Sequence, residues 1–230
     1  MLSIFDLLAA ETLDLDLAAY LMARISRGAS FMVGAVPGGA GKTTVMCALL
    51  NFVPSETSLI AATPEVVYSA ADGKASRRNC YICHEIGSGS YYAYLWSDPL
   101  RTYCCLSEQG HMLATNLHAD DPDQARNQVC GTNGVPKEYF NRFELLIFLR
   151  VKGGYFDSRR WIDLVYSSDG SSEHELVFAA AADGGASPTL HSDPEYVAAC
   201  REFLRAMEGK AGTIEQTREC VIDFLSRNSL

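Results

Sequence analysis

The chain has 230 residues, of which 48% are hydrophobic and 20% are charged, and its formal net charge is −9 at pH 7. This length and composition predict one globular α/β domain with a proper hydrophobic core and a small appendage. The negative charge argues against a stand-alone nucleic-acid-binding protein, and no apolar stretch is long enough to span a bilayer.

Hydrophobic periodicity predicts alternating helices and strands in the first half of the chain. Apolar residues at helical spacing predict a helix over 13–25, with Gly28 as its C-cap. Further helices are predicted over 43–51, 91–105 (interrupted at Asp98-Pro99) and 121–130, and strands over 30–36, 58–62, 79–86 and 112–116.

The second half begins with three predicted strands and ends with two amphipathic helices. The strands cover 143–151, 161–167 and 173–179 and read as hairpins on the edge of a parallel sheet. A linker of small residues over 180–187 precedes helices over 194–207 and 213–227. We therefore expect a core over 1–185, including an N-terminal helix, and a helical appendage over 186–230.

The most informative segment is the glycine-rich loop Gly34-Ala-Val-Pro-Gly-Gly-Ala-Gly-Lys-Thr-Thr44, which lies between a predicted strand and a predicted helix. That context is the one a phosphate-binding loop requires, because backbone N–H groups and the positive helix end converge on phosphate oxygens. Lys42 would reach the β- and γ-phosphates of ATP, and Thr43 would hold Mg²⁺. The motif G-x-x-x-x-G-K-[ST] asks for glycine where Val36 stands, and the alternative is a glycine turn that binds nothing. The predicted nucleotide-binding residues are Pro37, Gly38, Gly39, Ala40, Gly41, Lys42, Thr43 and Thr44.

Blocks that follow this loop resemble the type II and type IV secretion and pilus ATPases. Tyr81-Ile-Cys-His-Glu-Ile86 is similar to their apolar strand ending in Gly-Glu-Ile, and residues 110–121 are similar to their histidine box, with Gln124-Ala125-Arg126 continuing into the next helix. The resemblance covers about residues 28–180 and indicates a divergent, short member without the family's N-terminal domain. It implies a RecA-like P-loop fold, mostly a parallel sheet with helices on both faces, and a hexameric ring that acts as a motor.

The resemblance also assigns site roles. Glu85 would lie near Mg²⁺ and the attacking water, and the alternative is a strand-terminal glutamate that faces solvent. His118 would sense the γ-phosphate from the end of its strand, while His111 stands at that strand's start. Ligands of such sheets bind at the carboxyl ends of the strands, which favours His118 over His111 for direct contact.

The family pattern is broken at two places. Its acidic pair before a proline is replaced by Ala62 and Thr63, so that Glu65, just after Pro64, becomes a candidate stand-in for water activation together with Glu85. The arginine that follows Gly-Glu-Ile in the family is absent as well. Candidate replacements, from this subunit or a neighbouring one, are Arg77, Arg78 and Arg101.

These observations predict an Mg-ATP-dependent ATPase that drives a pilus or secretion assembly through a membrane-platform protein. The alternatives are a nucleotide-binding scaffold or switch with little hydrolysis and a small-molecule kinase, for which we find no lid arginine cluster. Neither nucleic acid nor direct membrane insertion is expected. Met1–Ala10 is not typical of a signal peptide because it lacks a basic start. The resemblance implies a cytoplasmic protein, held at the inner face of the cell membrane by its partner.

Eight cysteines raise the alternative of a zinc site. Cys80 and Cys83 form a C-x-x-C motif, but they lie in a predicted buried strand, whose alternation would send them to opposite faces. We therefore predict free, packed thiols in a reducing compartment.

Overall fold

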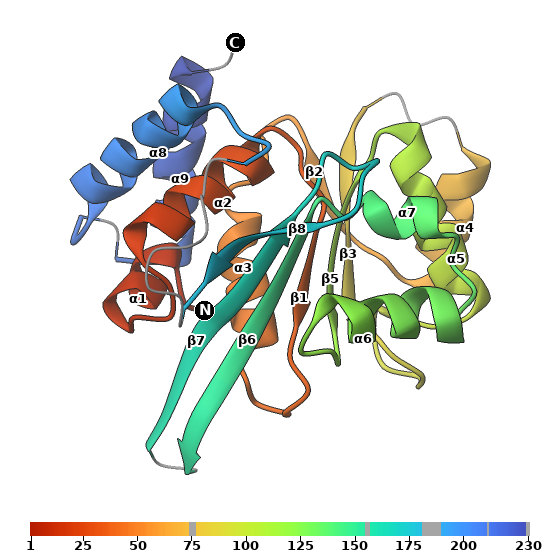
Figure 1. Ribbon diagram of the computed structural model, residues 1–230. Coiled ribbons are helices and arrows are strands. Elements are labelled where there is room, and N and C mark those ends of the chain that lie inside the picture. The colour runs from red at the N-terminus through yellow and green to blue at the C-terminus, as the bar shows by residue number, and fades with distance from the viewer. Residues whose placement is uncertain (74–76, 155–156, 181–189, 211, 229–230) are drawn as a thin grey trace.

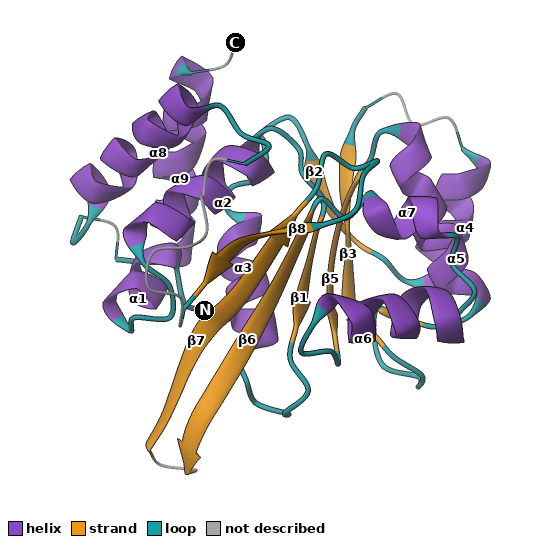
Figure 2. Ribbon diagram, viewed as in Figure 1, coloured by secondary structure: helices purple, strands orange, loops and turns teal. Residues whose placement is uncertain are grey.

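The computed structural model describes residues 1–73, 77–154, 157–180, 190–210 and 212–228. Its described residues form an eight-stranded sheet in the order β2-β3-β5-β1-β6-β7-β8, with β4 paired to β3 (Figures 1 and 2). The strands from β2 to β6 along this order are parallel, and the last two are antiparallel, so the predicted mostly parallel α/β fold with late hairpins is confirmed. The bounds are β1 Phe31–Gly34, β2 Ser58–Ala61, β3 Asn79–Ile86, β4 Tyr94–Leu95, β5 Met112–Leu117, β6 Leu145–Gly154, β7 Asp157–Ser167 and β8 Glu175–Ala179.

Helices cover both faces of the sheet (Figure 2). Each helical layer buries its apolar stripe against one side of the strands and makes its own hydrophobic cluster. One layer holds α1 Ile4–Ala9, α2 Leu15–Ser26, α3 Lys42–Leu50, α8 Pro194–Met207 and α9 Ile214–Arg227. The other holds α4 Pro64–Asp72, α5 Asp98–Cys105, α6 Pro122–Arg126 and α7 Lys137–Asn141.

The central strands are buried on both sides, which explains their continuous apolar sequences. Successive residues of β1 alternate between the two clusters: Phe31 and Val33 pack in one, and Met32 packs in the other. Cys80 and Cys83 are fully buried in opposite clusters, as the strand alternation predicts. Burial raises the pKa of each of these two thiols to about 12, so they remain protonated and unreactive at neutral pH.

The helix predicted over 91–105 is wrong in its first half. Ala93 and Ser97 have left-handed φ values of 56° and 53°, which interrupt any helix there, and β4 pairs with β3 instead. The helix α5 begins only at Asp98, with Pro99 in its first turn, where a missing N–H leaves no helical bond unmade.

Three short helices, α1, α4 and α7, were not among the predicted elements. Two of them carry local start signals: Ser3 and Asp6 form a capping box at α1, and Thr63 caps α4 ahead of Pro64. The two C-terminal helices match the prediction, and α8 packs on α2 within the same cluster. The predicted boundary at residue 185 lies outside the described residues, so the division into core and appendage stays a prediction.

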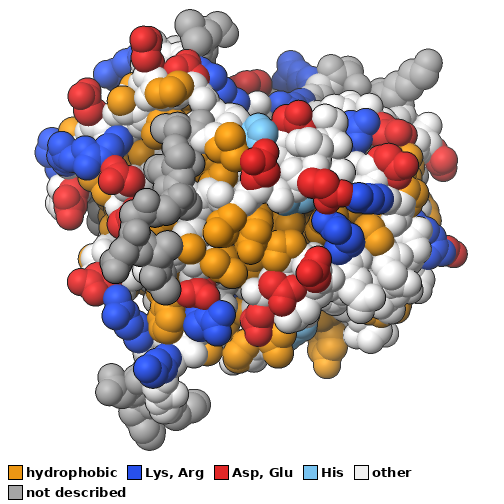
Figure 3. Space-filling view, viewed as in Figure 1, with side chains coloured by type: hydrophobic (Ala, Val, Ile, Leu, Met, Phe, Trp, Pro, Cys, Tyr) orange, Lys and Arg blue, Asp and Glu red, His pale blue; other side chains and the backbone are white. Residues whose placement is uncertain are grey.

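The antiparallel end of the sheet leaves part of an apolar face in contact with solvent. Figure 3 shows hydrophobic side chains gathered over the strands in the middle of this view, between groups of charged side chains. Leu176 of the edge strand β8 is 46% exposed.

Among the described residues, no helix is both long enough and apolar enough to cross a membrane.

Gly34, the last residue of β1, is required by close packing. A Cβ atom there would lie 2.6 Å from the Ala119 carbonyl oxygen and 2.7 Å from the Phe148 ring, both of which are buried. Gly34→Ala is therefore expected to lower the free energy of unfolding by about 1–3 kcal/mol, measured by urea denaturation. The control is Gly38→Ala, because a Cβ atom at Gly38 would meet no described atom within 4 Å. Equal stability of both variants would contradict this packing argument.

Candidate functional site

The glycine-rich loop connects β1 to α3 at the carboxyl edge of the sheet (Figure 1). Gly39 and Gly41 have φ values of 77° and 98°, a conformation that glycine adopts without strain. Gly41 is also the N-cap of α3 and provides no side-chain cap, so the first N–H groups of α3 are left for a ligand. Val36 has no left-handed φ, and its N–H donates to Asp120 Oδ1 at 2.8 Å. The position of Val36 therefore does not need the glycine of the motif.

Lys42 is the buried cation of this loop. Its side chain is only 8% exposed, and its Nζ lies 3.3 Å from the Ala35 carbonyl oxygen, to which it donates. The same atom lies 3.7 Å from Glu85 Oε2 and 3.5 Å from His118 Nδ1. Burial lowers the pKa of Lys42, and the Glu85 carboxylate opposes that shift.

Glu85 of β3 is the buried carboxylate that faces this lysine. It is 6% exposed, rather than turned to solvent, and its Oε1 lies 3.7 Å from His118 Nε2. That oxygen has no hydrogen-bond donor among the described residues. Burial raises the pKa of Glu85, while Lys42 and His118 favour its charged form. A buried carboxylate with a free oxygen beside a cation is suited to accept a proton from a water molecule or to bind a metal ion.

An irregularity in β3 aims two consecutive side chains at the loop. Cys83 pairs with Thr115 but Ile86 pairs with Leu117, so β3 holds one residue more than β5 between these points. Such a bulge breaks the usual alternation of side chains. As a result His84, the neighbour of Glu85, also reaches the loop.

His84 and Asn116 are site residues that sequence reasoning missed. His84 Nε2 lies 3.5 Å from Thr43 Oγ1, and Asn116 Nδ2 lies 3.5 Å from the same hydroxyl. Asn116 also donates to the His84 carbonyl at 2.8 Å, which holds the end of β3 against β5. The sequence did contain one signal for Asn116, because a polar asparagine stands within an apolar strand. The structure shows that this side chain is fully buried.

The two histidines of the histidine box lie at opposite ends of β5. His118 follows the strand, is 52% exposed, and its Nδ1 lies 3.2 Å from the Val36 carbonyl oxygen. His111 precedes the strand and is buried, with its Nδ1 accepting the Asn79 N–H at 3.1 Å. The structure thus places His118, and not His111, beside the glycine loop.

Glu65 is exposed in the first turn of α4, after the carboxyl end of β2. Its own backbone N–H and the Thr63 hydroxyl lower the pKa of Glu65, so it stays ionised. No contact of Glu65 with Lys42 or Glu85 occurs among the described residues, and its catalytic role stays a prediction.

Two of the three arginines suggested as charge donors lie away from the loop of their own chain. Arg77 and Arg78 precede β3 and therefore lie at the amino edge of the sheet, opposite the loop. Arg101 is held in α5 by Asp98 and by the Asn133 carbonyl oxygen. For a site within one chain Arg77 and Arg78 are wrong, because the strand direction carries them to the other edge. The role of Arg101 stays a prediction.

Arg160 of β7 contacts the glycine loop instead. Its Nε donates to the Gly39 carbonyl oxygen at 2.9 Å, and its Cδ would lie 3.6 Å from a Cβ atom on Gly41. The β6–β7 hairpin, which carries Arg160, extends beyond the end of the sheet (Figure 1). Because Arg160 holds a loop carbonyl, it supports the conformation in which the neighbouring N–H groups are free.

Arg160→Ala is expected to raise amide hydrogen exchange in the glycine loop and to weaken the Mg-ATP binding that the sequence predicts about threefold to tenfold, since one hydrogen bond is lost. Exchange mass spectrometry and calorimetry would measure the two effects. The control is Arg159→Ala, because Arg159 lies next to Arg160 but pairs with Glu11 at 3.5 Å. An equal effect of both substitutions would show that general charge, and not this contact, is responsible.

Comparison with solved structures finds similar ATPases. One is the VirB11 ATPase from the Brucella suis type IV secretion system, in complex with sulphate: the match covers 64% of this chain and 50% of that chain, with 18% identity and a TM-score of 0.45. Another is the Legionella pneumophila ATPase DotB, with 96% and 57% of the two chains covered, 13% identity and a TM-score of 0.44. The chain thus spans 50–57% of the length of these two proteins. No protein family and no curated protein matches the sequence.

Proposed function

We propose that this protein is a Mg-ATP-binding P-loop ATPase whose turnover drives a partner assembly of the pilus or secretion type. The observation that carries the proposal is the meeting of Lys42, Glu85 and His118 at the mouth of the glycine loop. A buried lysine, a buried carboxylate and a polar side chain that touches both are what phosphoryl transfer to water needs at one point.

The proposed residues fit a bound Mg²⁺. Glu85 Oε1 is buried without a hydrogen-bond donor among the described residues, and the Thr43 hydroxyl has only 3.5 Å contacts, so both oxygens are available as ligands. Oxygen ligands of this kind suit Mg²⁺, which would neutralise phosphate charge when bound. Thr43 and Glu85 would hold it.

The residues of the chain would then act in named roles. Residues 37–44 bind and orient the triphosphate, and Lys42 stabilises negative charge on the γ-phosphate oxygens. Glu85 orients a water molecule, which forms a new O–P bond while the bond from the γ-phosphorus to the bridging oxygen breaks. The water proton passes to the Glu85 carboxylate. His118, in contact with Glu85 and Lys42, would respond to loss of the γ-phosphate.

A nucleotide-binding switch with little hydrolysis is the second candidate, and one observation favours it. At the carboxyl end of β2, where the family carries its acidic pair, Ala62 is fully buried and Thr63 is used to cap α4. Glu85, meanwhile, is paired with Lys42. Without a second carboxylate, activation of water would be slow.

The deciding experiment is steady-state phosphate release from the purified protein with Mg-ATP, with nucleotide binding measured in parallel by calorimetry. Turnover that disappears in Lys42→Ala supports the ATPase. Binding without turnover supports the switch, and absence of both would refute the two proposals together.

Assembly into a homo-oligomeric ring, expected to be a hexamer, is part of the proposal and is supported by the sequence resemblance. A membrane-platform partner and a cytoplasmic location at the membrane's inner face are also part of the proposal, and the same resemblance supports them. The half-exposed His118 leaves the site open to a neighbouring subunit, which could provide the missing arginine. Analytical ultracentrifugation with and without Mg-ATP tests this: a monomer under both conditions would contradict the ring.

A further inference from the structure

A polar pocket lies at the amino edge of the sheet, opposite the glycine loop. Its volume is ≈ 370 Å³. The segments that enter β1, β3, β5 and β6 meet there, together with the turn that follows β7. The residues used in the argument below are Gly28, Arg78, His111, Arg142, Glu144 and Asp169, all of which line the pocket.

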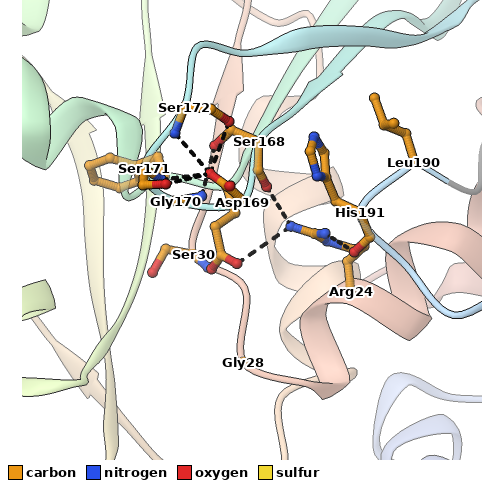
Figure 4. A network of polar contacts seen from close by, with 12 residues as sticks. Arg24, Gly28, Ser30, Ser168, Asp169, Gly170, Ser171, Ser172, Leu190 and His191 are labelled. Atoms are coloured by element: carbon orange, nitrogen blue, oxygen red, sulfur yellow. Dashed lines mark hydrogen bonds and ion pairs between the residues drawn. The ribbon is translucent and has the colours of Figure 1, made fainter.

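The carboxylates of this pocket already have donors. Glu144 Oε1 lies 3.4 Å from Arg24 Nη2, and its Oε2 accepts the Ser30 N–H at 3.2 Å. Asp169 Oδ1 accepts the backbone and hydroxyl donors of Ser171 and Ser172 at 2.8–2.9 Å, as Figure 4 shows. These hydrogen bonds, first those of the Ser172 and Ser171 backbone, hold the pKa of Asp169 well below its usual range. Both carboxylates are thus hydrogen-bonded without the remaining arginines, although the nearby charge of Arg78 also favours the ionised form of Glu144.

Among the described residues, the hydrogen-bond partners of these remaining arginines are carbonyl oxygens. Arg78 Nη2 donates to the Gly28 carbonyl at 2.8 Å, and Arg142 Nη1 donates to the Ser107 carbonyl at 3.4 Å. Both side chains are exposed, and neither makes a direct ion pair with a carboxylate within the described part of the chain. Two guanidinium groups thus line one pocket without a direct ion pair among the described residues, and each has several N–H donors to spare.

One of the lining residues, His111, provides a neutral donor. His111 is only 3% exposed, and because its Nδ1 accepts the Asn79 N–H, its proton lies on Nε2. That Nε2 is buried and has no hydrogen-bond partner among the described residues. Burial and the nearby Arg78 lower the pKa of His111, which keeps the ring neutral. An unpaired buried N–H is costly unless a ligand accepts it.

A glycine leaves room for one arginine beside the pocket. Gly28 has a left-handed φ of 98°, and a Cβ atom there would lie 1.9 Å from Arg78 Nη1. No other residue type would let the guanidinium group lie against this turn.

We propose that this pocket is a second anion site, which binds the phosphate group of a ligand distinct from the nucleotide of the glycine loop. Arg78 and Arg142 provide the charge and the paired donors that suit phosphate oxygens, and His111 donates from Nε2. The phosphate belongs either to a soluble phosphorylated molecule or to a lipid headgroup, because both present the same oxygens.

The test uses Lys42→Ala as background, so that the glycine loop contributes little phosphate binding. Calorimetry with pyrophosphate examines the soluble source, and sedimentation with phosphatidylcholine vesicles, with and without phosphatidic acid, examines the lipid source. In whichever arm binds, Arg78→Ala and Arg142→Ala are each expected to weaken binding about tenfold. Arg77→Ala is the matched control, because it removes an equal exposed charge that does not line the pocket.

A second readout needs no substitution in the pocket. In the Lys42→Ala protein labelled with ¹⁵N, the binding ligand should shift the His111 Nε2 resonance. Failure of both arms to bind would overturn the proposal, as would equal weakening by Arg77→Ala or an unchanged His111 resonance. Because no arm requires ATP hydrolysis, this outcome is independent of the proposed ATPase activity.

Discussion

Lys42→Ala is expected to raise the Kd for Mg-ATP at least about 100-fold, because the substitution removes the buried cation that meets the phosphates. It also leaves Glu85 facing them without its 3.7 Å partner. Since Lys42 favours the charged form of Glu85, the pKa of that carboxyl group should rise further in the variant. Calorimetric titration with Mg-ATP measures the effect on binding.

The control for this substitution is Lys152→Ala. Lys152 is an exposed residue of β6, so its removal changes the net charge equally but leaves the loop intact. Binding that survives Lys42→Ala, or that is lost to the same extent in Lys152→Ala, would show that the glycine loop is not the nucleotide site.

Glu85→Gln is expected to lower kcat for phosphate release about 10²- to 10⁴-fold, while Mg-ATP binding stays within about tenfold of the original. The amide keeps the size of the side chain but cannot take a proton from water. The Glu85 carboxylate raises the pKa of Lys42, so the substitution lowers this pKa further and weakens Mg-ATP binding. The substitution also removes a negative charge beside the triphosphate, which strengthens Mg-ATP binding. Comparison of single-turnover rates with calorimetric Kd values separates the two effects.

Glu65→Gln is the companion variant, because Glu65 is the other carboxylate expected to activate water. Glu65 is exposed and hydrogen-bonded within its own helix turn, so we expect a smaller loss than for Glu85→Gln. A loss as large as that of Glu85→Gln would assign Glu65 a direct catalytic part. Full activity in Glu85→Gln would refute the proposed role of Glu85.

Most helices and strands could be predicted from the sequence because their start, stop and periodicity signals lie within the elements themselves. The helix α8 begins after Asp193, whose carboxylate accepts the N–H groups of Glu195 and Tyr196, with Pro194 at the start. The wrong helix prediction over 91–97 has a local cause too. The φ values of Ala93 and Ser97 are positive, and neither residue type is typical of that conformation.

The edge of the sheet on which the site lies was also predictable. The glycine loop, Glu85 and His118 each stand at or just after the end of an apolar strand, and the ends of parallel strands meet at one edge. The same rule separates His111, at a strand's start, from the loop. No knowledge of the strand order was needed for these statements.

The contacts across that edge depended on the order and register of the strands, which short-range patterns do not encode. The extra residue of β3 turns His84 as well as Glu85 toward the loop, and that bulge exists only in the pairing with β5. Arg160 reaches Gly39 across 121 positions because β6 pairs with β1 and leads β7 back beside the loop. Sequence therefore specifies which residues stand at strand ends, while packing of distant strands selects which of them touch, because such contacts form between segments that have no local influence on each other.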